Sequence, residues 1–211
     1  MVNGFTPIKG TTTIGIKASD GVVLAADRRA TAGYTVANKH VKKILTVTSY
    51  CAITIAGTVG EAFNLADRVR SEAYMYELRN NVRMGVKSIA NYASLLINSK
   101  KFSVFPLQII IGGYDSSPEL FMIDFFGSLS AEDYVATGSG MHTALGSALN
   151  RLKPNLSLTE AIPIAIRSVS AAMEWDTATG EGVDVVYADK EGVKRMSEDE
   201  VAKYIAGGNA Q

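Results

Sequence analysis

The chain has 211 residues, of which 47% are hydrophobic and 20% charged, a balance that is ordinary for a globular domain. Lysine plus arginine and aspartate plus glutamate both number 21, so the zero formal net charge excludes the basic excess of a nucleic-acid-binding surface. The single cysteine excludes an internal disulfide, and no apolar stretch reaches the ~18 residues that a membrane-spanning helix needs.

The first part of the chain carries the pattern of two β-hairpins. TTTIGIKA (11–18) and VVLAAD (22–27) are short β-branched or apolar runs on either side of a turn that contains glycine. KKILTVT (42–48) and CAITIAG (51–57) repeat this arrangement. Cys51 alternates with apolar residues in the last of these strands, which favours a buried and unreactive thiol.

Helical periodicity begins after the second hairpin. Apolar residues at helical spacing predict one helix across 62–76 and another across 86–97, joined around Asn80-Asn81 as an antiparallel pair. The apolar runs LQIIIGGY (107–114) and LFMIDFFG (120–127) then predict two further strands. The middle of the chain is therefore expected to be a helix pair followed by a strand pair.

A second helix pair is predicted at 141–152 and 158–173. Ser157 and Glu160 have the spacing of a capping box at the start of the later helix. Pro163 lies inside that helix and should bend it near its beginning.

The end of the chain completes a repeating order of hairpins and helix pairs. Strands are predicted at 183–189 and 192–196, followed by a short helix from Ser197. This order predicts a mixed α/β fold in which two antiparallel sheets pack together with helices outside them. No linker, repeat or low-complexity tract divides the sequence, so we expect one domain.

Most of the familiar catalytic apparatus is missing from the sequence. The two histidines, His40 and His142, lie far apart, and there is no HExxH or CxxC motif, so we expect neither a bound metal nor a histidine-based triad. The glycines of AGTVGE and ATGSG complete no phosphate-binding loop. Any nucleophile in this chain would therefore need a base other than histidine.

A leader of ten residues ends at Gly10, and three threonines follow it. A threonine hydroxyl needs a base to take its proton, and the α-amine of an N-terminal residue, with a pKa of about 7.7–8.0, is such a base. Cleavage after Gly10 would give Thr11 that amine, and glycine leaves its carbonyl open to the neighbouring hydroxyl. The alternative is that the threonines only form an edge strand after an unstructured tail.

Further motifs occur in a fixed order between Gly10 and about residue 200. They are GTTT (10–13), DGVVLAADRRAT (20–31), VKKI (41–44), AGTVGE (56–61), ATGSG (136–140) and AMEWDTATGEGVDV (172–185). In this set and spacing the chain resembles a β-type subunit of the 20S proteasome, most closely the archaeal form. The resemblance implies a four-layer αββα sandwich of two antiparallel sheets flanked by helix pairs, which agrees with the order of elements above.

The resemblance implies that residues 1–10 are a propeptide and that 11–211 form a single N-terminal-nucleophile hydrolase domain. Thr11 would be the nucleophile after autocatalytic cleavage between Gly10 and Thr11. Lys43 matches the catalytic lysine, whose ammonium favours the neutral amine and the alkoxide-like hydroxyl. Asp27 matches the carboxylate that pairs with this lysine.

The resemblance also implies residues that surround and support the Thr11 nucleophile. Ser139, Asp176 and Thr179 match a cluster around the threonine, although the family usually has serine at the last position; Thr179 keeps the hydroxyl and adds a methyl. Gly57 matches the residue whose backbone N–H forms the oxyanion hole, and a helix start directs such groups outward. Arg29 matches a nearby position with a structural role.

Substrate recognition is also implied by the resemblance. Thr31 and Val59 would hold an extended peptide through their backbones, as an added β-strand. The first specificity pocket maps to five uncharged apolar residues: Ala30, Val41, Leu45, Ile55 and Val59. Without an acid or a base in this set, we expect chymotrypsin-like cleavage after large hydrophobic residues, although Leu45 and Ile55 would equally suit a plain core.

The resemblance implies a threonine endopeptidase that degrades unfolded polypeptides in the cytoplasm and needs no cofactor. Its partners would be other β subunits in seven-membered rings and proteasome α subunits, in a barrel of twenty-eight subunits whose α rings engage a regulatory ATPase. One alternative is an unprocessed, catalytically silent β-type subunit that only builds the ring. Another is a different N-terminal-nucleophile hydrolase, such as a small-molecule amidase or the simpler bacterial two-ring protease.

Overall fold

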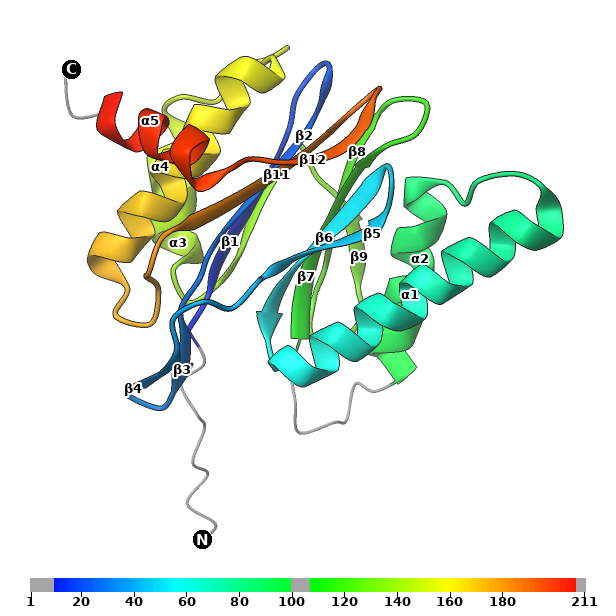
Figure 1. The fold of residues 1–211 in the computed structure, drawn as a ribbon, viewed down its shortest axis with the longest axis horizontal. Helices are drawn as coiled ribbons and strands as arrows, with labels where there is room; N and C mark the ends of the chain where they lie inside the picture. Colours follow the sequence, from blue (N-terminus) through cyan, green and yellow to red (C-terminus); the bar gives the residue numbers. More distant parts are fainter. Residues whose placement is uncertain (1–9, 100–106, 208–211) are drawn as a thin grey trace, which may run out of the picture.

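A computed structural model describes residues 10–99 and 107–207, so the predicted leader lies outside the described residues except for Gly10. Two five-stranded sheets face each other, and helices cover the outer face of each (Figure 1). The predicted four-layer αββα sandwich of antiparallel sheets, within the mixed α/β class, is confirmed.

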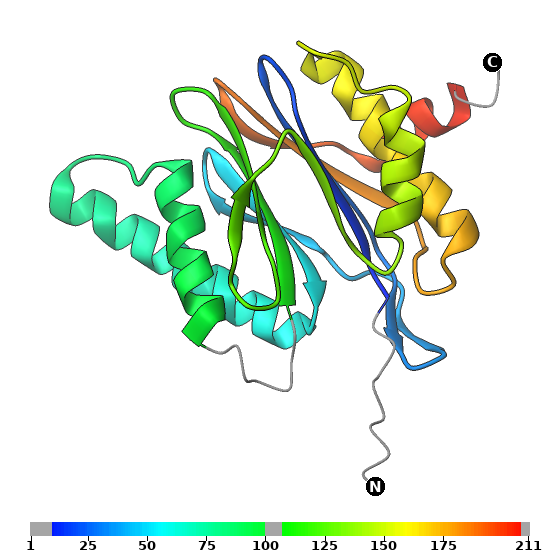
Figure 2. The ribbon, with the colours of Figure 1, turned by 180° about the vertical axis from the view of Figure 1, so that it is seen from behind.

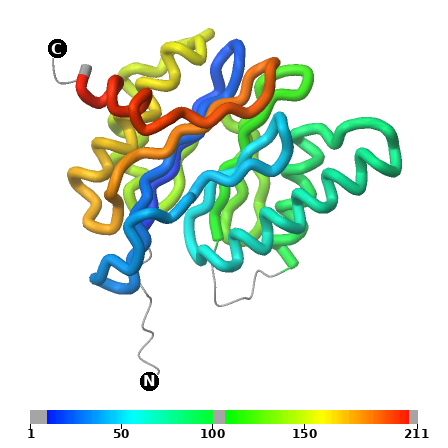
Figure 3. Tube along the Cα trace, viewed as in Figure 1, coloured from blue at the N-terminus to red at the C-terminus, as the bar shows by residue number. Residues whose placement is uncertain are grey.

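The first sheet, called the β1 sheet below, has the strand order β10-β1-β2-β11-β12, and all neighbouring strands are antiparallel. Its strands are β1 (Thr12–Lys17), β2 (Gly21–Asp27), β10 (Tyr134–Gly138), β11 (Val183–Asp189) and β12 (Gly192–Arg195). β2 and β11 pair although they are far apart in the sequence, and they lie side by side in Figure 3. This pairing, which joins Asp27 to Val183, brings the segment before β11 to the end of β2.

The second sheet, called the β6 sheet, has the order β5-β6-β7-β8-β9 and is also antiparallel. Its strands are β5 (Ile44–Thr48), β6 (Cys51–Gly57), β7 (Leu107–Tyr114), β8 (Pro118–Ile123) and β9 (Leu129–Ala131). A separate two-stranded hairpin of β3 (Ala30–Ala32) and β4 (Thr35–Asn38) extends from one end of the sandwich (Figure 1).

The helices form the two outer layers. The β6 sheet is covered by α1 (Val59–Asn80) and α2 (Val86–Ser99). The β1 sheet is covered by α3 (Met141–Leu149) and α4 (Leu158–Trp175), and α5 (Glu198–Gly207) packs beside α4, as the reverse view in Figure 2 shows. Each helix pair follows a strand pair in the chain, as the sequence predicted.

Three hydrophobic cores separate the four layers. Because side chains alternate along a strand, β6 directs Ile53 and Ile55 towards α1 and α2 and directs Ala52 towards the β1 sheet. The core between the sheets is made mostly of aliphatic side chains, among them Leu24 and Ile110. A single strand thus serves two cores, which explains why β6 is apolar almost throughout.

Several local predictions are confirmed. The Ser157 N–H donates to the Glu160 carboxylate at 3.0 Å in the predicted capping box. Pro163 lies inside α4, and the bend that we expect there stays a prediction. α1 ends at Asn80, and the left-handed residue Asn81 caps it, where we placed the connection between the helices. Cys51 is fully buried, and burial raises the pKa of its thiol.

Other local predictions are wrong. The strand predicted for 120–127 ends at Ile123, because the Asp124 carboxylate accepts the N–H groups of Phe126 and Ser128 and forms a turn. The helix predicted for 141–152 ends at Leu149. The short strands β3, β4, β9 and β10 were not predicted.

Candidate active site

The site begins where the chain enters β1. Thr11 directly precedes this strand and is only 6% exposed. Its hydroxyl donates to the Gly10 carbonyl at 2.6 Å, and the Lys43 ammonium donates to the same oxygen at 3.4 Å. The hydroxyl and the lysine therefore meet at the carbonyl of the bond that we expected to be cleaved.

Asp27 and Lys43 form an ion pair between the two sheets. Asp27 ends β2 in one sheet, and Lys43 precedes β5 in the other, with 2.6 Å between its Nζ and Asp27 Oδ1. Asp27 is fully buried, and it also accepts the backbone N–H groups of Thr12, Arg29 and Gly180 at 2.9–3.0 Å. This fourfold acceptance holds a carboxylate beside the lysine and orients the ammonium.

Burial controls the protonation of Lys43. The side chain is 2% exposed, and this desolvation lowers its pKa by more than the neighbouring Asp27 carboxylate raises it. An amine of lowered pKa gives up its proton more readily than a surface lysine, while the ion pair keeps it in place. Such a group is suited to proton transfer beside Thr11.

A second set of hydrogen bonds approaches Thr11 from β10 and the loop after α4. The Thr11 N–H donates to Ser139 Oγ at 3.2 Å, and Ser139 Oγ donates to Asp176 Oδ2 at 2.5 Å. Thr179 also donates to Asp176, at 2.6 Å, and its hydroxyl lies 2.7 Å from that of Thr12. The hydroxyl that Thr179 shares with serine is thus hydrogen-bonded despite the additional methyl group.

Thr12, which the sequence analysis did not single out, connects the two halves of the site. Its N–H is bonded to Asp27, and its hydroxyl is bonded to Thr179. The signal was present in the sequence, since Thr12 belongs to the threonine triplet and begins a strand.

Glycines allow the backbone segments of the site to approach each other. A Cβ added to Gly138, which has a φ of +92°, would lie 2.0 Å from the Thr11 carbonyl oxygen. At Gly140 an added Cβ would lie 2.0 Å from the Thr12 hydroxyl. At Gly10 it would lie 1.8 Å from Ala178 Cβ and 2.3 Å from the Ala178 carbonyl oxygen. These contacts give a physical reason for the glycines of GTTT and ATGSG.

Gly57 ends β6 and has a φ of +130°, a conformation that favours glycine. Thr58 separates it from α1, which starts at Val59, so the turn from strand to helix expected around Gly57 is present. On the opposite side of the site, the Thr31 hydroxyl accepts the Gly10 N–H at 2.9 Å. Gly10 is thereby held at both its N–H and its carbonyl.

The expected specificity-pocket residues come from several elements around the site. Ala30 starts β3, Val41 precedes β5, and both are partly buried. Leu45 is partly buried on β5, whereas Ile55 is 3% exposed and belongs to the core beneath α1 and α2. Val59 is the partly buried first residue of α1.

Arg29 forms hydrogen bonds to the loop that carries Asp176 and Thr179. Its guanidinium donates to the Thr177 carbonyl at 2.8 Å and to Glu181 at 3.1 Å. These contacts fit the structural role that we expected for Arg29.

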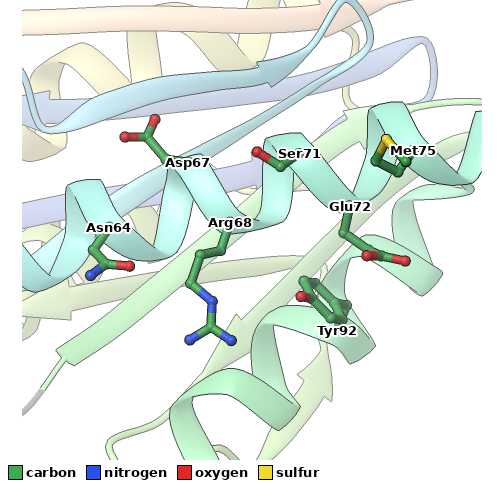
Figure 4. A pocket seen from close by; sticks show the side chains of 7 residues that line it. All are labelled: Asn64, Asp67, Arg68, Ser71, Glu72, Met75 and Tyr92. Atoms are coloured by element: carbon green, nitrogen blue, oxygen red, sulfur yellow. The ribbon is translucent and has the colours of Figure 1, made fainter.

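A groove of about 630 Å³ lies elsewhere, between α1 and α2 (Figure 4). It is lined by Asn64, Asp67, Arg68, Ser71, Glu72, Met75 and Tyr92. None of the site residues above contributes to it.

Within 10–99 and 107–207, no group of three or more His, Cys, Asp or Glu side chains could hold a metal ion. In the same part of the chain, no helix is long and apolar enough to cross a membrane.

A four-layer αββα sandwich with a threonine directly before an inner strand, beside a buried lysine–aspartate pair, is the arrangement typical of the class of N-terminal-nucleophile hydrolases. The sequence profile of the family described as "Proteasome subunit" matches residues 8–188. The chain therefore belongs to the proteasome subunit family, and its curated relatives place it among the β subunits.

Three relatives illustrate this similarity. "Proteasome subunit beta 2" of Hyperthermus butylicus is 48% identical over 190 residues, which are 90% of this chain and 90% of that protein. "Proteasome subunit beta" of Methanopyrus kandleri is 45% identical over 202 residues, 94% of this chain and 96% of that protein. "Proteasome subunit beta 1" of Thermococcus sibiricus is 38% identical over 198 residues, again 94% and 96%.

Proposed function

We propose that this chain is a catalytic β subunit of the 20S proteasome core, a threonine endopeptidase that first removes its own residues 1–10. The observation that carries the proposal is the meeting of the Thr11 hydroxyl and the Lys43 ammonium at the Gly10 carbonyl oxygen. The alternative of a silent ring-building subunit gives no reason for this arrangement around one peptide bond.

Autolysis would begin with attack of Thr11 Oγ on the Gly10 carbonyl carbon. The Gly10–Thr11 C–N bond then breaks, the hydroxyl proton passes to the Thr11 nitrogen, and water hydrolyses the remaining ester to release the leader. Before cleavage Thr11 has no free amine. Burial lowers the pKa of Lys43, so more of this lysine is in the neutral amine form, which would take the hydroxyl proton and return it to the Thr11 nitrogen as the C–N bond breaks.

Peptide hydrolysis would reuse the same groups. The freed amine of Thr11 takes the proton of its own hydroxyl, the hydroxyl oxygen attacks the substrate carbonyl, and the Gly57 N–H stabilises the oxyanion. Ser139, Asp176 and Thr179 hold the amine, because Ser139 already contacts this nitrogen in the uncleaved chain. The substrate C–N bond breaks as the Thr11 ammonium gives its proton to the leaving amine, and water then hydrolyses the ester of the acyl-enzyme.

The substrate would be an unfolded polypeptide, held as an added strand by the backbones of Thr31 and Val59. The apolar side chains of Ala30, Val41 and Val59 support a preference for large hydrophobic residues, whereas the burial of Ile55 in the α1/α2 core makes its contribution indirect. The chain would act in the cytoplasm, in seven-membered β rings stacked between α rings that engage a regulatory ATPase.

The test is Thr11→Ala in particles assembled with proteasome α subunits. We expect intact mass to show a retained leader and fluorogenic peptides ending in a hydrophobic residue to remain uncut, while assembly persists. Lys43→Ala should behave in nearly the same way. Normal processing and peptide cleavage by either variant would refute the roles, and a wild-type chain that starts at Met1 in the assembled particle would favour the silent subunit.

A further inference from the structure

Three buried threonine hydroxyls form a line of hydrogen bonds between the two sheets. Thr13 Oγ1 on β1 lies 2.7 Å from Thr137 Oγ1 on the neighbouring strand β10. From the opposite sheet, Thr54 on β6 donates to Thr13 Oγ1 at 3.0 Å. All three residues are 0% exposed. We call these residues the hydroxyl chain.

The surroundings of the hydroxyl chain are apolar. The core between the sheets consists of Val22, Leu24, Ala26, Ile44, Ala52, Ile110, Leu120, Val135 and Val186. The hydrophobic contribution of such contacts is not directional, so it defines the relative position of the two sheets less sharply than a hydrogen bond does. Hydrogen bonds depend on distance and angle, and a buried hydroxyl that loses its partner is destabilising. The hydroxyl chain therefore selects one relative position of the two sheets.

Thr54, the member of the hydroxyl chain on the β6 sheet, is also hydrogen-bonded to the backbone of its own sheet. The Ile110 N–H of β7 donates to Thr54 Oγ1 at 3.3 Å, so this hydroxyl accepts from the β6 sheet while it donates to the β1 sheet. Thr54 thus connects the backbone of one sheet to a side chain of the other.

The hydroxyl chain lies immediately behind the candidate active site. Thr13 is two residues after Thr11 on the same face of the strand, and Thr137 is two residues before Ser139. Thr54 belongs to the strand that ends at Gly57, and it pairs with Ile44, the neighbour of Lys43. The nucleophile belongs to one sheet, whereas the lysine and the oxyanion donor belong to the other.

We infer that Thr13, Thr54 and Thr137 are positioning residues whose hydrogen bonds hold the Thr11-bearing strand in catalytic register with Lys43 and Gly57. The inference rests on the proposed function, because it assigns these residues to the reaction of Thr11. They touch neither the substrate nor the reacting atoms, and they act through the relative placement of the sheets.

The experiment replaces Thr54 by valine, which keeps the shape and removes the hydroxyl, in particles assembled with proteasome α subunits. We expect kcat for a fluorogenic hydrophobic peptide to fall about tenfold while KM stays within about twofold, because the misplacement affects the chemical step and not the binding of the peptide strand. Thr54→Ser retains the hydroxyl and should restore kcat to within about twofold of wild type.

Ile53→Val is the matched control. Ile53 is the neighbour of Thr54 on β6, but it faces α1 and α2, so the change removes a buried methylene without touching the hydroxyl chain. We expect a lower thermal midpoint and an unchanged kcat per assembled particle. This contrast separates positioning from a general loss of stability.

Thr137→Val provides a second variant should Thr54→Val fail to assemble. It removes the other hydrogen bond of Thr13 and leaves the bond between the sheets in place, so kcat should fall less. In the double variant the loss of kcat should be smaller than the product of the single losses, because both act through Thr13.

A kcat of Thr54→Val equal to that of Ile53→Val, or no recovery in Thr54→Ser, would overturn the inference while leaving the proposed function intact. Peptide cleavage by Thr11→Ala, or an inactive wild-type particle, would refute the proposed function, and the inference would fall with it.

Discussion

Replacement of Gly10 by alanine is the most direct test of the geometry around the scissile bond. The new Cβ would lie 1.8 Å from Ala178 Cβ, 2.3 Å from the Ala178 carbonyl oxygen and 2.5 Å from Ala178 Cα. Carbon atoms in contact are about 3.5–4.0 Å apart, so residue 10 or the loop must move by more than about 1 Å. The obstruction is mainly backbone and cannot be relieved by a change of rotamer.

Such a movement displaces the carbonyl that Thr11 would attack in the proposed autolysis. A misplacement of about 1 Å at a reacting centre can cost about a hundredfold in rate, and we expect leader removal to slow by about that factor. Residue 10 leaves with the leader, so the mature Gly10→Ala chain is identical to wild type. Every particle that has been processed should therefore cleave peptides at the wild-type rate.

The assay is a time course of intact mass after assembly, together with peptide hydrolysis per processed chain. Gly146→Ala on α3 is the control, because an added Cβ there meets nothing within 4 Å. Addition of Ala178→Gly to Gly10→Ala should give little recovery, since the carbonyl oxygen and Cα of residue 178 remain in the way. Leader removal by Gly10→Ala at the wild-type rate would refute the reasoning.

Three further predictions follow from individual contacts. Asp27→Asn leaves Lys43 buried without a counter-charge, so we expect the free energy of unfolding in denaturant to fall by about 3–5 kcal/mol and the leader to be retained. As a control, Asp67→Asn, in an exposed ion pair with Arg70, should change neither the free energy of unfolding nor leader removal. Thr31→Val removes the acceptor of the Gly10 N–H, so leader removal, followed by intact mass, should slow about three- to tenfold. Thr31→Ser keeps the acceptor, and removal of its leader at the wild-type rate would support the hydrogen bond as the cause. The hydrogen bond from Lys153, followed by those from Ser157, lowers the pKa of Glu160 to about 2 from 4.5. Because the carboxyl pKa is lowered on folding, Glu160 stabilises the fold above pH 4.5, and this contribution is lost as the pH falls towards 2. Glu160→Gln should therefore lower the thermal midpoint at pH 7. A difference in thermal midpoint that persists at pH 2 would contradict this assignment.

The long elements of the fold could be predicted because each shows its own periodicity. β6 is a continuous apolar run of strand length. α4 repeats apolar residues at helical spacing, and its capping residues agree with this pattern. β10 contains five residues, and two of its flanking positions are exposed. Its strand conformation depends on pairing with β1, so it could not be predicted from local sequence.

The site could be predicted only in part, for a related reason. The Gly10-Thr11 junction carries a chemical argument of its own, but nothing local connects Thr11 to Asp27, Lys43 or Asp176. The resemblance supplied those positions, and the structure brings Asp27 and Lys43 to 2.6 Å. The need for Gly138 and Gly140 could not be predicted, because the atoms that exclude a side chain there belong to Thr11 and Thr12, which lie far away in the sequence.

The three threonines of the triplet differ in role because successive side chains along a strand point to opposite faces of the sheet. Thr11 and Thr13 share the face that looks towards the β6 sheet, where Lys43 and Thr54 lie, whereas the Thr12 hydroxyl is bonded to Thr179 on the other side. The three hydroxyls therefore cannot replace one another, although their chemistry is the same. A chain trimmed artificially to begin at Thr12 would have a free amine and a hydroxyl, but that hydroxyl would face away from Lys43. We therefore expect such a chain to leave fluorogenic peptides uncut, because the proposed reaction needs a threonine at this point of the strand and on this face, and not merely a threonine at the end of the chain.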